Sequence, residues 1–381
     1  MRVLILSCDT GEGHNSAANA ICEYLTKVNV ECEVLDALLF KSRHASKFAA
    51  QAYLHVIRIP HLFGMIYNAG RLVSNSKFKS PVYYMNKCYR KRLHDYINKK
   101  KFDIIITTHL FPAEALTALK RENLLNIPTI AVNTDYTCIP FWEETELDYY
   151  IIPHEDLVDE FLRRGIPKEK LLPFGIPIKP EFYKKTPKEE ARKKVCELYN
   201  ICFDFSKPWY MIMSGSMGYG KVHQLVNAIT KIQKTDINII VICGTNQKLK
   251  NKLDIEYMNF KNVAILGFCN DIPLLMDACD VLFTKPGGLS STEAAVKNIP
   301  IIHTAPIPGC ETKNSEFFMK RSMSYSSKRI KKQLKTAVRI CSDEDYRNLI
   351  IKSQTENISR NTCNNIYSLL TELERKEGMI S

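Results

Sequence analysis

Short apolar runs alternate with helical stretches along most of the chain, and they do so in two separate series. The first series comprises residues 2–7, 31–35, 103–108, 128–133 and 148–153. The second comprises residues 209–214, 237–244, 262–268, 280–284 and 300–304. Strands that alternate with helices form parallel sheets covered by helices, because a parallel crossover needs a long connection to return the chain. The sequence therefore predicts an α/β protein with two doubly wound, Rossmann-like domains.

A proline-rich stretch separates the two series. Residues 173–187 contain four prolines and are followed by a charged run at 188–194. A chain of 381 residues exceeds the size at which a single core usually stops growing, so two domains are expected. We predict an N-terminal domain at 1–174 and a second domain at 175–360. An amphipathic helix at about 361–376 is suited to pack back on the first domain.

The segment from Thr284 to Glu293 predicts a strand, a tight turn and a helix start. Glycines allow a ligand to approach the backbone, and the free N–H groups of a helix start attract a diphosphate. The residues of this turn and helix start are Gly287, Gly288, Ser290, Ser291 and Thr292. Glu293 is expected in the first helical turn, where its carboxylate would bind ribose hydroxyls. The alternative is an ordinary turn in which Glu293 only favours the helix dipole.

Two further glycine loops follow predicted strands. Residues 10–14, which include Gly13 and His14, follow the first strand of the chain. Ser214 and Gly215 begin a glycine-rich loop after the strand at 209–213. Each loop alone is equally consistent with a simple tight turn, since no GK[ST] sequence follows either one. Ligands of such sheets bind at the carboxyl ends of the strands, so the three loops together suggest a cleft between two sheets, with a nucleotide held chiefly by the second.

The excess of positive over negative charge lies in one segment. The formal net charge is +12, yet residues 37–102 contain fourteen Lys and Arg against a single acid, Asp95. Large aromatic residues are interleaved with these charges, including Phe63, Tyr67 and Tyr84. Basic and aromatic residues together are typical of a surface that binds anionic lipid headgroups. Nucleic acid is the competing interpretation, but no recognised nucleic-acid module accompanies the charge. We therefore expect the 41–101 segment to bind an anionic membrane surface and no nucleic acid.

The cysteines and histidines suggest neither disulfides nor a metal site. The thirteen cysteines form no CxxC pair, and the nine histidines fall in no ligand pattern. The only DxD, Asp343 to Asp345, follows Ser342 at a helix start, where capping explains it. With no signal peptide and no long apolar span in this sequence, a reduced cytosolic protein with peripheral membrane contact is expected.

Several motifs resemble those of family-28 GT-B glycosyltransferases. They are RVLILSCDTGEGHNSAA at the start, FGIPIKPEF at 174–182, TKPGGLSSTEA at 284–294 and APIPGCETKN at 305–314. Within the family, the resemblance is to bacterial processive diacylglycerol β-glucosyltransferases and plant monogalactosyldiacylglycerol synthases. It implies an inverting transfer of a hexose, glucose above all, from a UDP-sugar to diacylglycerol at the cytosolic membrane surface. It also implies that no metal or other cofactor takes part.

The resemblance also implies roles for individual residues. His14 and Asp135 would face the acceptor hydroxyl, with His14 as base or as phosphate ligand. Phe268 would meet the uracil, and Glu293 the ribose. The diphosphate would be held by the glycine loops and the helix start, and the hexose by Gly309, Cys310 and Glu311. Cys310 stands where the family usually has glutamine.

Two other functions compete with this one. A peptidoglycan-type transferase of N-acetylglucosamine from UDP to a lipid shares the glycine loops and the PGG turn. A catalytically weak nucleotide-sugar-sensing protein is suggested by Cys310. The GIPI sequence at 175–178 and the unbroken basic segment favour the glycerolipid enzyme.

Overall fold

The computed structural model describes residues 1–9, 12–42, 65, 67, 69–70, 79–213, 215, 221–233, 236–304 and 306–378. The chain divides into two compact units. The first comprises Met1–Pro180, Ile307–Cys310 and Ser359–Ser381, and the second comprises Glu181–Pro306 and Glu311–Ile358. The first unit thus extends to Pro180, beyond position 174 but within the proline-rich stretch. A short 3-10 helix, η5 (Pro180–Tyr183), spans the boundary.

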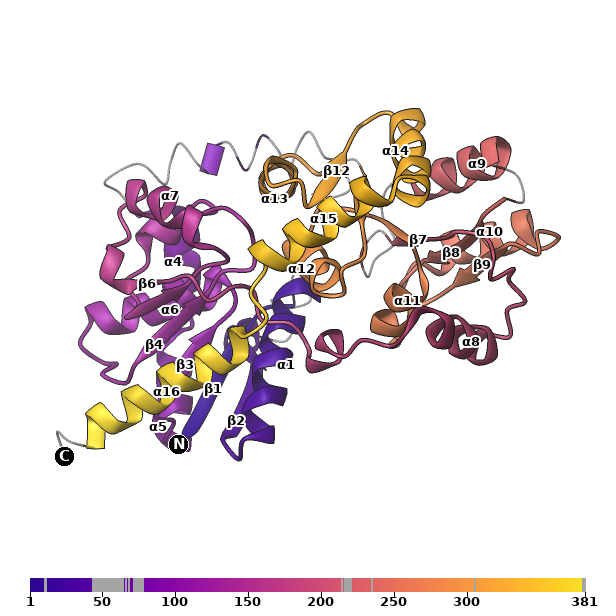
Figure 1. Ribbon diagram of the computed structural model, residues 1–381. Coiled ribbons are helices and arrows are strands. Elements are labelled where there is room, and N and C mark those ends of the chain that lie inside the picture. Colours follow the sequence, from indigo (N-terminus) through magenta and orange to yellow (C-terminus); the bar gives the residue numbers. More distant parts are fainter. Residues whose placement is uncertain are drawn as a thin grey trace. The chain divides into compact units, whose positions relative to one another are not determined.

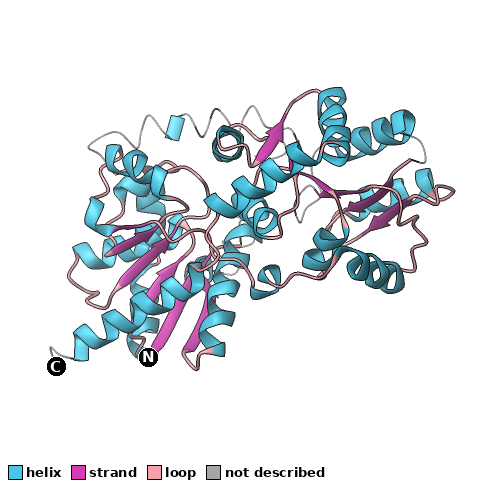
Figure 2. Cartoon of the chain, viewed as in Figure 1, coloured by secondary structure: helices cyan, strands magenta, loops and turns pink. Residues whose placement is uncertain are grey.

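The first unit is built on a six-stranded parallel sheet with the strand order β2-β1-β3-β4-β5-β6 (Figure 2). Its strands are β1 (Arg2–Ser7), β2 (Glu31–Asp36), β3 (Ile104–Thr107), β4 (Thr129–Val132), β5 (Tyr149–Ile151) and β6 (Leu171–Leu172). The five strands expected from the apolar runs are present. The two-residue edge strand β6 was not expected, because a segment so short shows no periodicity.

Helices alternate with most of these strands along the chain and lie beside the sheet (Figure 1). They are α1 (Glu12–Lys27), α4 (Pro81–Lys87), α5 (Arg90–Lys100), α6 (Leu110–Arg121), α7 (Val158–Arg163) and α16 (Thr362–Gly378). The described part of the unit also contains the 3-10 helices η1 (Ala37–Phe40), η2 (Trp142–Glu144), η3 (Glu155–Leu157) and η4 (Lys168–Lys170). In α1, Ala17, Ala18, Ile21 and Leu25 recur at helical spacing and are buried, so this face packs on the sheet.

The C-terminal helix α16 packs on the first unit. Its buried residues Ile366, Leu370 and Leu373 join the core formed by β1, β3, β4 and α1, and α16 lies beside α1 in Figure 1. Its first residue, Thr362, donates a hydrogen bond from Oγ1 to the carbonyl oxygen of Phe174 at 2.8 Å. Gly175 has φ +102°, and a Cβ there would lie 2.6 Å from Thr362 Oγ1. Only glycine fits this close approach of chain segments.

The second unit has a six-stranded parallel sheet in the order β12-β11-β10-β7-β8-β9. Its strands are β7 (Trp209–Met213), β8 (Asn238–Ile242), β9 (Val263–Leu266), β10 (Val281–Thr284), β11 (Ile301–His303) and β12 (Ser324–Ser326). Its helices are α8 (Lys188–Tyr199), α9 (Val222–Gln233), α10 (Gln247–Tyr257), α11 (Ile272–Ala278), α12 (Gly288–Val296), α13 (Cys310–Lys320), α14 (Ile330–Ser342) and α15 (Glu344–Asn357). The three-residue edge strand β12 is the second strand that the apolar pattern did not predict.

Three smaller expectations from the sequence can be compared with the structure. Asp343 caps α15 by accepting a hydrogen bond from the backbone N–H of Tyr346, which confirms the capping interpretation of the DxD sequence. None of the thirteen cysteines, all of which are described, forms a disulfide. Within the described ranges, no helix combines the length and apolar character that a membrane span requires.

Candidate functional site

His14 lies at the start of α1, beside the carboxyl ends of β3 and β4. Its ring Nδ1 is 2.8 Å from the carbonyl oxygen of Thr108, which follows β3. The hydroxyl Oγ1 of Thr134, which follows β4, is 3.1 Å from the same nitrogen. The Thr108 hydroxyl donates in return to the carbonyl oxygen of His14 at 3.1 Å. These contacts join residues 94 and 120 positions apart and fix the imidazole at the edge of the first sheet.

The contact with Thr108 decides the tautomer of His14. A carbonyl oxygen can only accept a hydrogen bond, so Nδ1 carries the proton and donates it. In a neutral imidazole the other nitrogen, Nε2, then holds the lone pair. This arrangement resembles the orientation of a catalytic base by a hydrogen bond to its second nitrogen. His14 can therefore accept a proton at Nε2.

Two opposing effects act on the basicity of His14. Burial lowers the pKa of His14 below its ordinary value, while the negative charge of Asp135 and the hydrogen bond to the Thr108 carbonyl act to raise it. The ring of His109 lies edge-on to His14 with a centroid distance of 4.6 Å. Burial and the neighbouring His14 hold the pKa of His109 well below its usual range. At neutral pH both imidazoles are uncharged.

Asp135 follows β4 in the sequence Asn133-Thr134-Asp135, at the same edge of the sheet as His14. The negative charge of its carboxylate acts to raise the pKa of His14, and Asp135 is partly exposed. The structure thus brings together the two predicted catalytic residues. The supporting Thr108, Thr134 and His109 were missed by the sequence analysis. Their position directly after predicted strands was the only signal that could have indicated them.

In the second unit, the turn after β10 opens α12 as the sequence predicted. Gly287 is the N-cap of α12, with φ −70° and ψ 139°, and Gly288 is its first helical residue. The backbone N–H groups of the first helical residues have no partner within the helix, and they carry the positive end of its dipole. If Gly287 were alanine, no described heavy atom would lie within 4 Å of its Cβ. The helix start therefore presents backbone donors beside a space that no described residue fills.

The hydroxyls of Ser291 and Thr292 point away from this space. Ser291 is fully buried, and its Oγ lies 3.0 Å from Nε2 of His303. Burial lowers the pKa of His303 to about 3, so this histidine is a neutral part of the core. Thr292 donates from Oγ1 to the carbonyl oxygen of Gly288 at 2.7 Å. The backbone N–H of Ser291 is also engaged, because it donates to the carbonyl oxygen of Gly287 at 3.0 Å. The donors at this helix start are therefore the backbone N–H groups that precede Ser291, and Ser290 is partly exposed.

Glu293 does not lie in the first turn, contrary to our expectation. The helix begins earlier than predicted, at Gly288, and its first turn contains no acidic residue. The dipole interaction fades beyond the first turn. The alternative interpretation, in which Glu293 merely favours the dipole, is weakened by this position. Glu293 is partly exposed on α12.

The remaining predicted donor-site residues follow other strands of the second sheet. Gly215 follows β7 with φ +75°, while Ser214 lies outside the described residues. Phe268 follows β9 and is 64% exposed. Gly309 has φ +114° and precedes the partly exposed Cys310, the first residue of α13. In the first unit, Gly13 is the second residue of α1 and has no described heavy atom within 4 Å of an added Cβ.

Two side-chain contacts connect the PGG turn to α13. Asn314 donates from Nδ2 to the carbonyl oxygen of Pro286 at 3.0 Å and is fully buried. Lys285 Nζ lies 3.0 Å from Oε1 of Glu311, and both side chains are largely buried. Within the second unit, the turn at 285–286 is thus joined to α13 through Glu311 and Asn314. The sequence analysis assigned no role to Lys285 or Asn314.

Comparison with known proteins gives the same two-part division. Residues 14–178 match the monogalactosyldiacylglycerol (MGDG) synthase family, and residues 210–311 match the glycosyltransferase family 28 C-terminal domain. The chain is 29% identical over 347 residues to a processive diacylglycerol beta-glucosyltransferase of Bacillus subtilis, covering 90% of this chain and 88% of the relative. The protein of the same name from Staphylococcus carnosus is 26% identical, with coverage of 90% and 85%.

Solved structures show the fold. MurG of Acinetobacter baumannii superposes with a TM-score of 0.65 at 13% identity, covering 97% of this chain and 99% of MurG. Anabaena Alr3699/HepE in complex with UDP-glucose gives a TM-score of 0.58 at 14% identity, covering 98% of this chain and all of that one. The two matched families together span more than half of the chain. The chain therefore belongs to the family-28 glycosyltransferases of the GT-B fold that carry a monogalactosyldiacylglycerol synthase domain.

Proposed function

We propose that this protein is an inverting glycosyltransferase that moves a hexose from a UDP-sugar to 1,2-diacylglycerol. The observation that carries the proposal is the match of the two units to an MGDG synthase domain and a family 28 C-terminal domain, together with relatives named diacylglycerol glucosyltransferases. These relatives favour glucose as the hexose. The site geometry supports the same chemistry.

In the proposed reaction, the acceptor hydroxyl attacks C1 of the hexose. The new bond from the acceptor oxygen to C1 forms as the bond from C1 to the β-phosphate oxygen breaks. His14 Nε2 takes the acceptor proton, because the hydrogen bond from Nδ1 to Thr108 leaves Nε2 as the basic nitrogen. The electron pair of the broken bond stays on the diphosphate, which binds at the start of α12. Phe268 and Glu293 are proposed to contact the uracil and the ribose.

One assay separates this proposal from its competitors. The purified protein is incubated with UDP-glucose, UDP-galactose or UDP-N-acetylglucosamine and with vesicles that contain diacylglycerol or lipid II. Glycosylated diacylglycerol is the expected product. Since the helix start itself offers positive charge to the diphosphate, we propose that no metal is needed and that EDTA leaves the activity intact. A product from lipid II alone would favour the peptidoglycan-type enzyme, and UDP binding without any product would favour the sensor.

Substitution of Glu293 by glutamine is expected to weaken UDP binding by about 1–3 kcal/mol. The carboxylate would lose a charge-assisted hydrogen bond to the ribose while the shape of the side chain is kept. Calorimetric titration with UDP measures the effect, and Glu189→Gln on the exposed face of α8 is the matched control. Unchanged affinity in a folded Glu293→Gln variant would remove Glu293 from the site.

Replacement of Gly287 by alanine is expected to weaken UDP binding without affecting the stability of the fold. The residue has φ −70° and an unfilled space beside it, so alanine is tolerated and the melting temperature is unchanged. The added methyl would stand where the diphosphate approaches, and UDP affinity should fall roughly tenfold or more. Gly175→Ala is the contrast, because φ +102° and the contact with Thr362 predict a loss of stability. Full UDP affinity of Gly287→Ala would place the diphosphate elsewhere.

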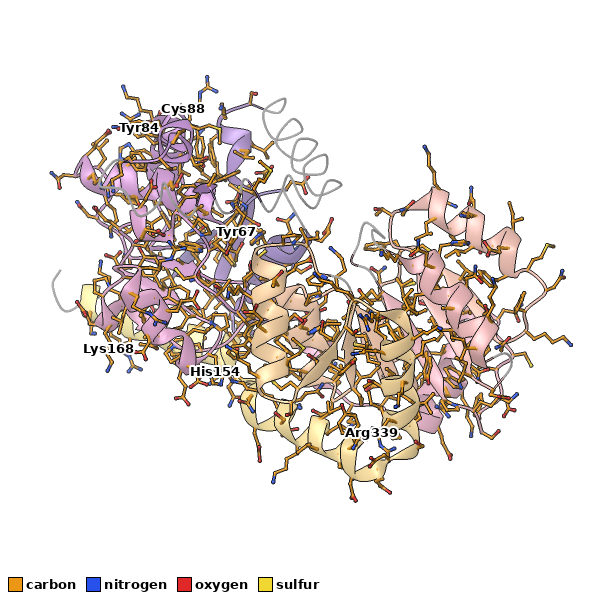
Figure 3. All side chains as sticks on the ribbon, turned by 90° about the horizontal axis from the view of Figure 1, so that it is seen from above. Tyr67, Tyr84, Cys88, His154, Lys168 and Arg339 are labelled. Carbon is orange, nitrogen blue, oxygen red and sulfur yellow. The ribbon has the colours of Figure 1, made fainter. Side chains whose placement is uncertain are left out.

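We also propose that the basic segment at 41–101 binds an anionic membrane surface on the cytosolic side. Its described part includes α4 and α5, on which Tyr84 is 61% exposed and Met85 is also exposed. Figure 3 shows Tyr84 beside Cys88 at the periphery of the first unit. Lys91 and Arg92 are exposed, and Arg92 also donates to the carbonyl oxygens of Phe40 and Lys41. Lys87 and Arg90 both contact Glu122, at 3.1 and 2.8 Å.

The pairing of Lys87 and Arg90 refines the test of this surface. Neutralising Lys91 and Arg92 together with glutamine should weaken binding to anionic vesicles by about 30-fold, at ~1 kcal/mol for each charge. The effect should fade as salt rises, because the Debye length shortens. Lys331→Gln with Lys332→Gln on α14 removes the same charge from the second unit and should have no effect. Vesicle sedimentation measures both, and equal behaviour of the two double variants would exclude this surface.

A further inference from the structure

Lys285 lies at the carboxyl end of β10, shortly before the start of α12. It directly follows β10, whose last residue Thr284 pairs with Met213 of β7. Gly215, two residues after β7, therefore lies at the same edge, and a Cβ on Gly215 would be 3.6 Å from Lys285 Cε. The α12 helix begins three residues after Lys285, at Gly288. Lys285 thus lies between Gly215 and the start of α12, both of which are predicted to hold the diphosphate.

In this structure the ammonium group of Lys285 forms an ion pair with the carboxylate of Glu311. Nζ and Oε1 are 3.0 Å apart, with the two side chains 18% and 13% exposed. Removing two charges from water is costly, and buried ion pairs are often no more stabilising than apolar residues of similar size. A pair of this kind at the carboxyl ends of parallel strands therefore requires a reason other than stability. Glu311 belongs to the loop to which the family resemblance assigns the hexose.

The proposed chemistry supplies that reason. When the bond from C1 to the β-phosphate oxygen breaks, its electron pair adds negative charge to the departing UDP. The start of α12 offers about half a positive charge through its N–H groups. The hydroxyls of Ser291 and Thr292 are engaged elsewhere, with His303 and with the Gly288 carbonyl. A lysine ammonium adds a full charge and three donors to the same oxygens.

We propose that Lys285 is a catalytic residue that binds the β-phosphate of the donor, and that Glu311 holds it in place while the site is empty. This inference rests on the proposed function. When the donor enters, the ammonium exchanges Glu311 for a phosphate oxygen, and the freed Glu311 carboxylate accepts hydrogen bonds from hexose hydroxyls. Lys285 then stabilises the UDP that leaves.

Calorimetry with a set of nucleotides tests the assignment. Lys285→Met should weaken UDP binding about 10- to 100-fold, as expected for a lost charge-assisted hydrogen bond. Uridine, which has no phosphate, should bind the variant and the unchanged protein equally. Lys285→Arg should recover much of the UDP affinity, because the charge is restored. Equal UDP affinity of the unchanged protein and Lys285→Met would overturn the inference, as would an equal loss for uridine.

A double variant controls for the Glu311 carboxylate, which loses its contact with Lys285 in Lys285→Met. In Lys285→Met with Glu311→Gln, that negative charge is removed, and UDP binding should remain weak. Recovery of full affinity in the double variant would show that Glu311 repelled the ligand, and it would also overturn the inference. Glu311→Gln alone should bind UDP at least as tightly as the unchanged protein. Failure of the proposed function gives a different result, in which the unchanged protein itself binds no UDP or transfers no hexose.

Discussion

Substitution of His14 by alanine is expected to lower the rate of hexose transfer by 100- to 10,000-fold while UDP affinity stays the same. A general base contributes about this much to the rate and little to the binding of the ground state. Steady-state kinetics with diacylglycerol vesicles and calorimetry with UDP give the two quantities. His223→Ala on α9 is the matched control, since His223 lies outside the proposed membrane surface and contacts Glu256 at 2.6 Å. If UDP affinity falls in step with the rate, His14 is a phosphate ligand.

The pH profile tests the role of Asp135 beside His14. Transfer needs neutral His14, so kcat/KM should fall as the pH drops through the pKa of His14, which burial holds below its ordinary value. The Asp135 charge favours the protonated imidazole and raises this pKa. Asp135→Asn should therefore move the acid limb of the profile to lower pH and leave the plateau measurable. Complete loss of activity in Asp135→Asn would instead identify Asp135 as the base.

The supporting contacts of His14 show where the sequence stops being informative. The apolar runs predicted ten of the twelve strands that the described residues form, because a buried parallel strand reads as a continuous apolar segment. The edge strands β6 and β12 are too short to show such a pattern. His14 could be singled out from its glycine loop, but its partners Thr108 and Thr134 come from loops far away in the sequence. Contacts of this kind follow from strand order, which periodicity does not encode.

At the start of α12, the sequence predicted the residues but not the directions of their side chains. The sequence predicted a turn and a helix start with three hydroxyl residues, yet Ser291 bonds His303 in the core. The direction of each side chain depends on the residue at which the helix begins, and that residue is Gly288. The same shift moves Glu293 out of the first turn. Helix boundaries are the least certain part of a prediction from sequence, and here they decide which groups face the ligand.

The helix α12 is anchored at its C-terminal end by a buried ion pair. Lys297, its C-cap, contacts Asp277 of α11 and the carbonyl oxygen of Lys184, with the Lys297 and Asp277 side chains 1% and 2% exposed. Asp277 also accepts from the backbone N–H of Thr186 at 3.0 Å. Burial lowers the pKa of Lys297, while the carboxylate of Asp277 acts to raise it. The pair therefore joins α12 to α11 and to the chain that enters the second unit.

Lys297→Met is expected to destabilise the second unit by about 3–5 kcal/mol, because it leaves the carboxylate of Asp277 buried without its counter-charge. Urea unfolding followed by Trp209 fluorescence measures the loss in a Trp142→Phe background, which removes the signal of the first unit. Adding Asp277→Asn should recover most of the loss, since the amide oxygen still accepts from Thr186 without a charge. Lys194→Met, at an exposed pair with Glu190, should change stability by less than about 1 kcal/mol. A Lys297→Met effect no larger than that of Lys194→Met would show that the pair does not anchor α12.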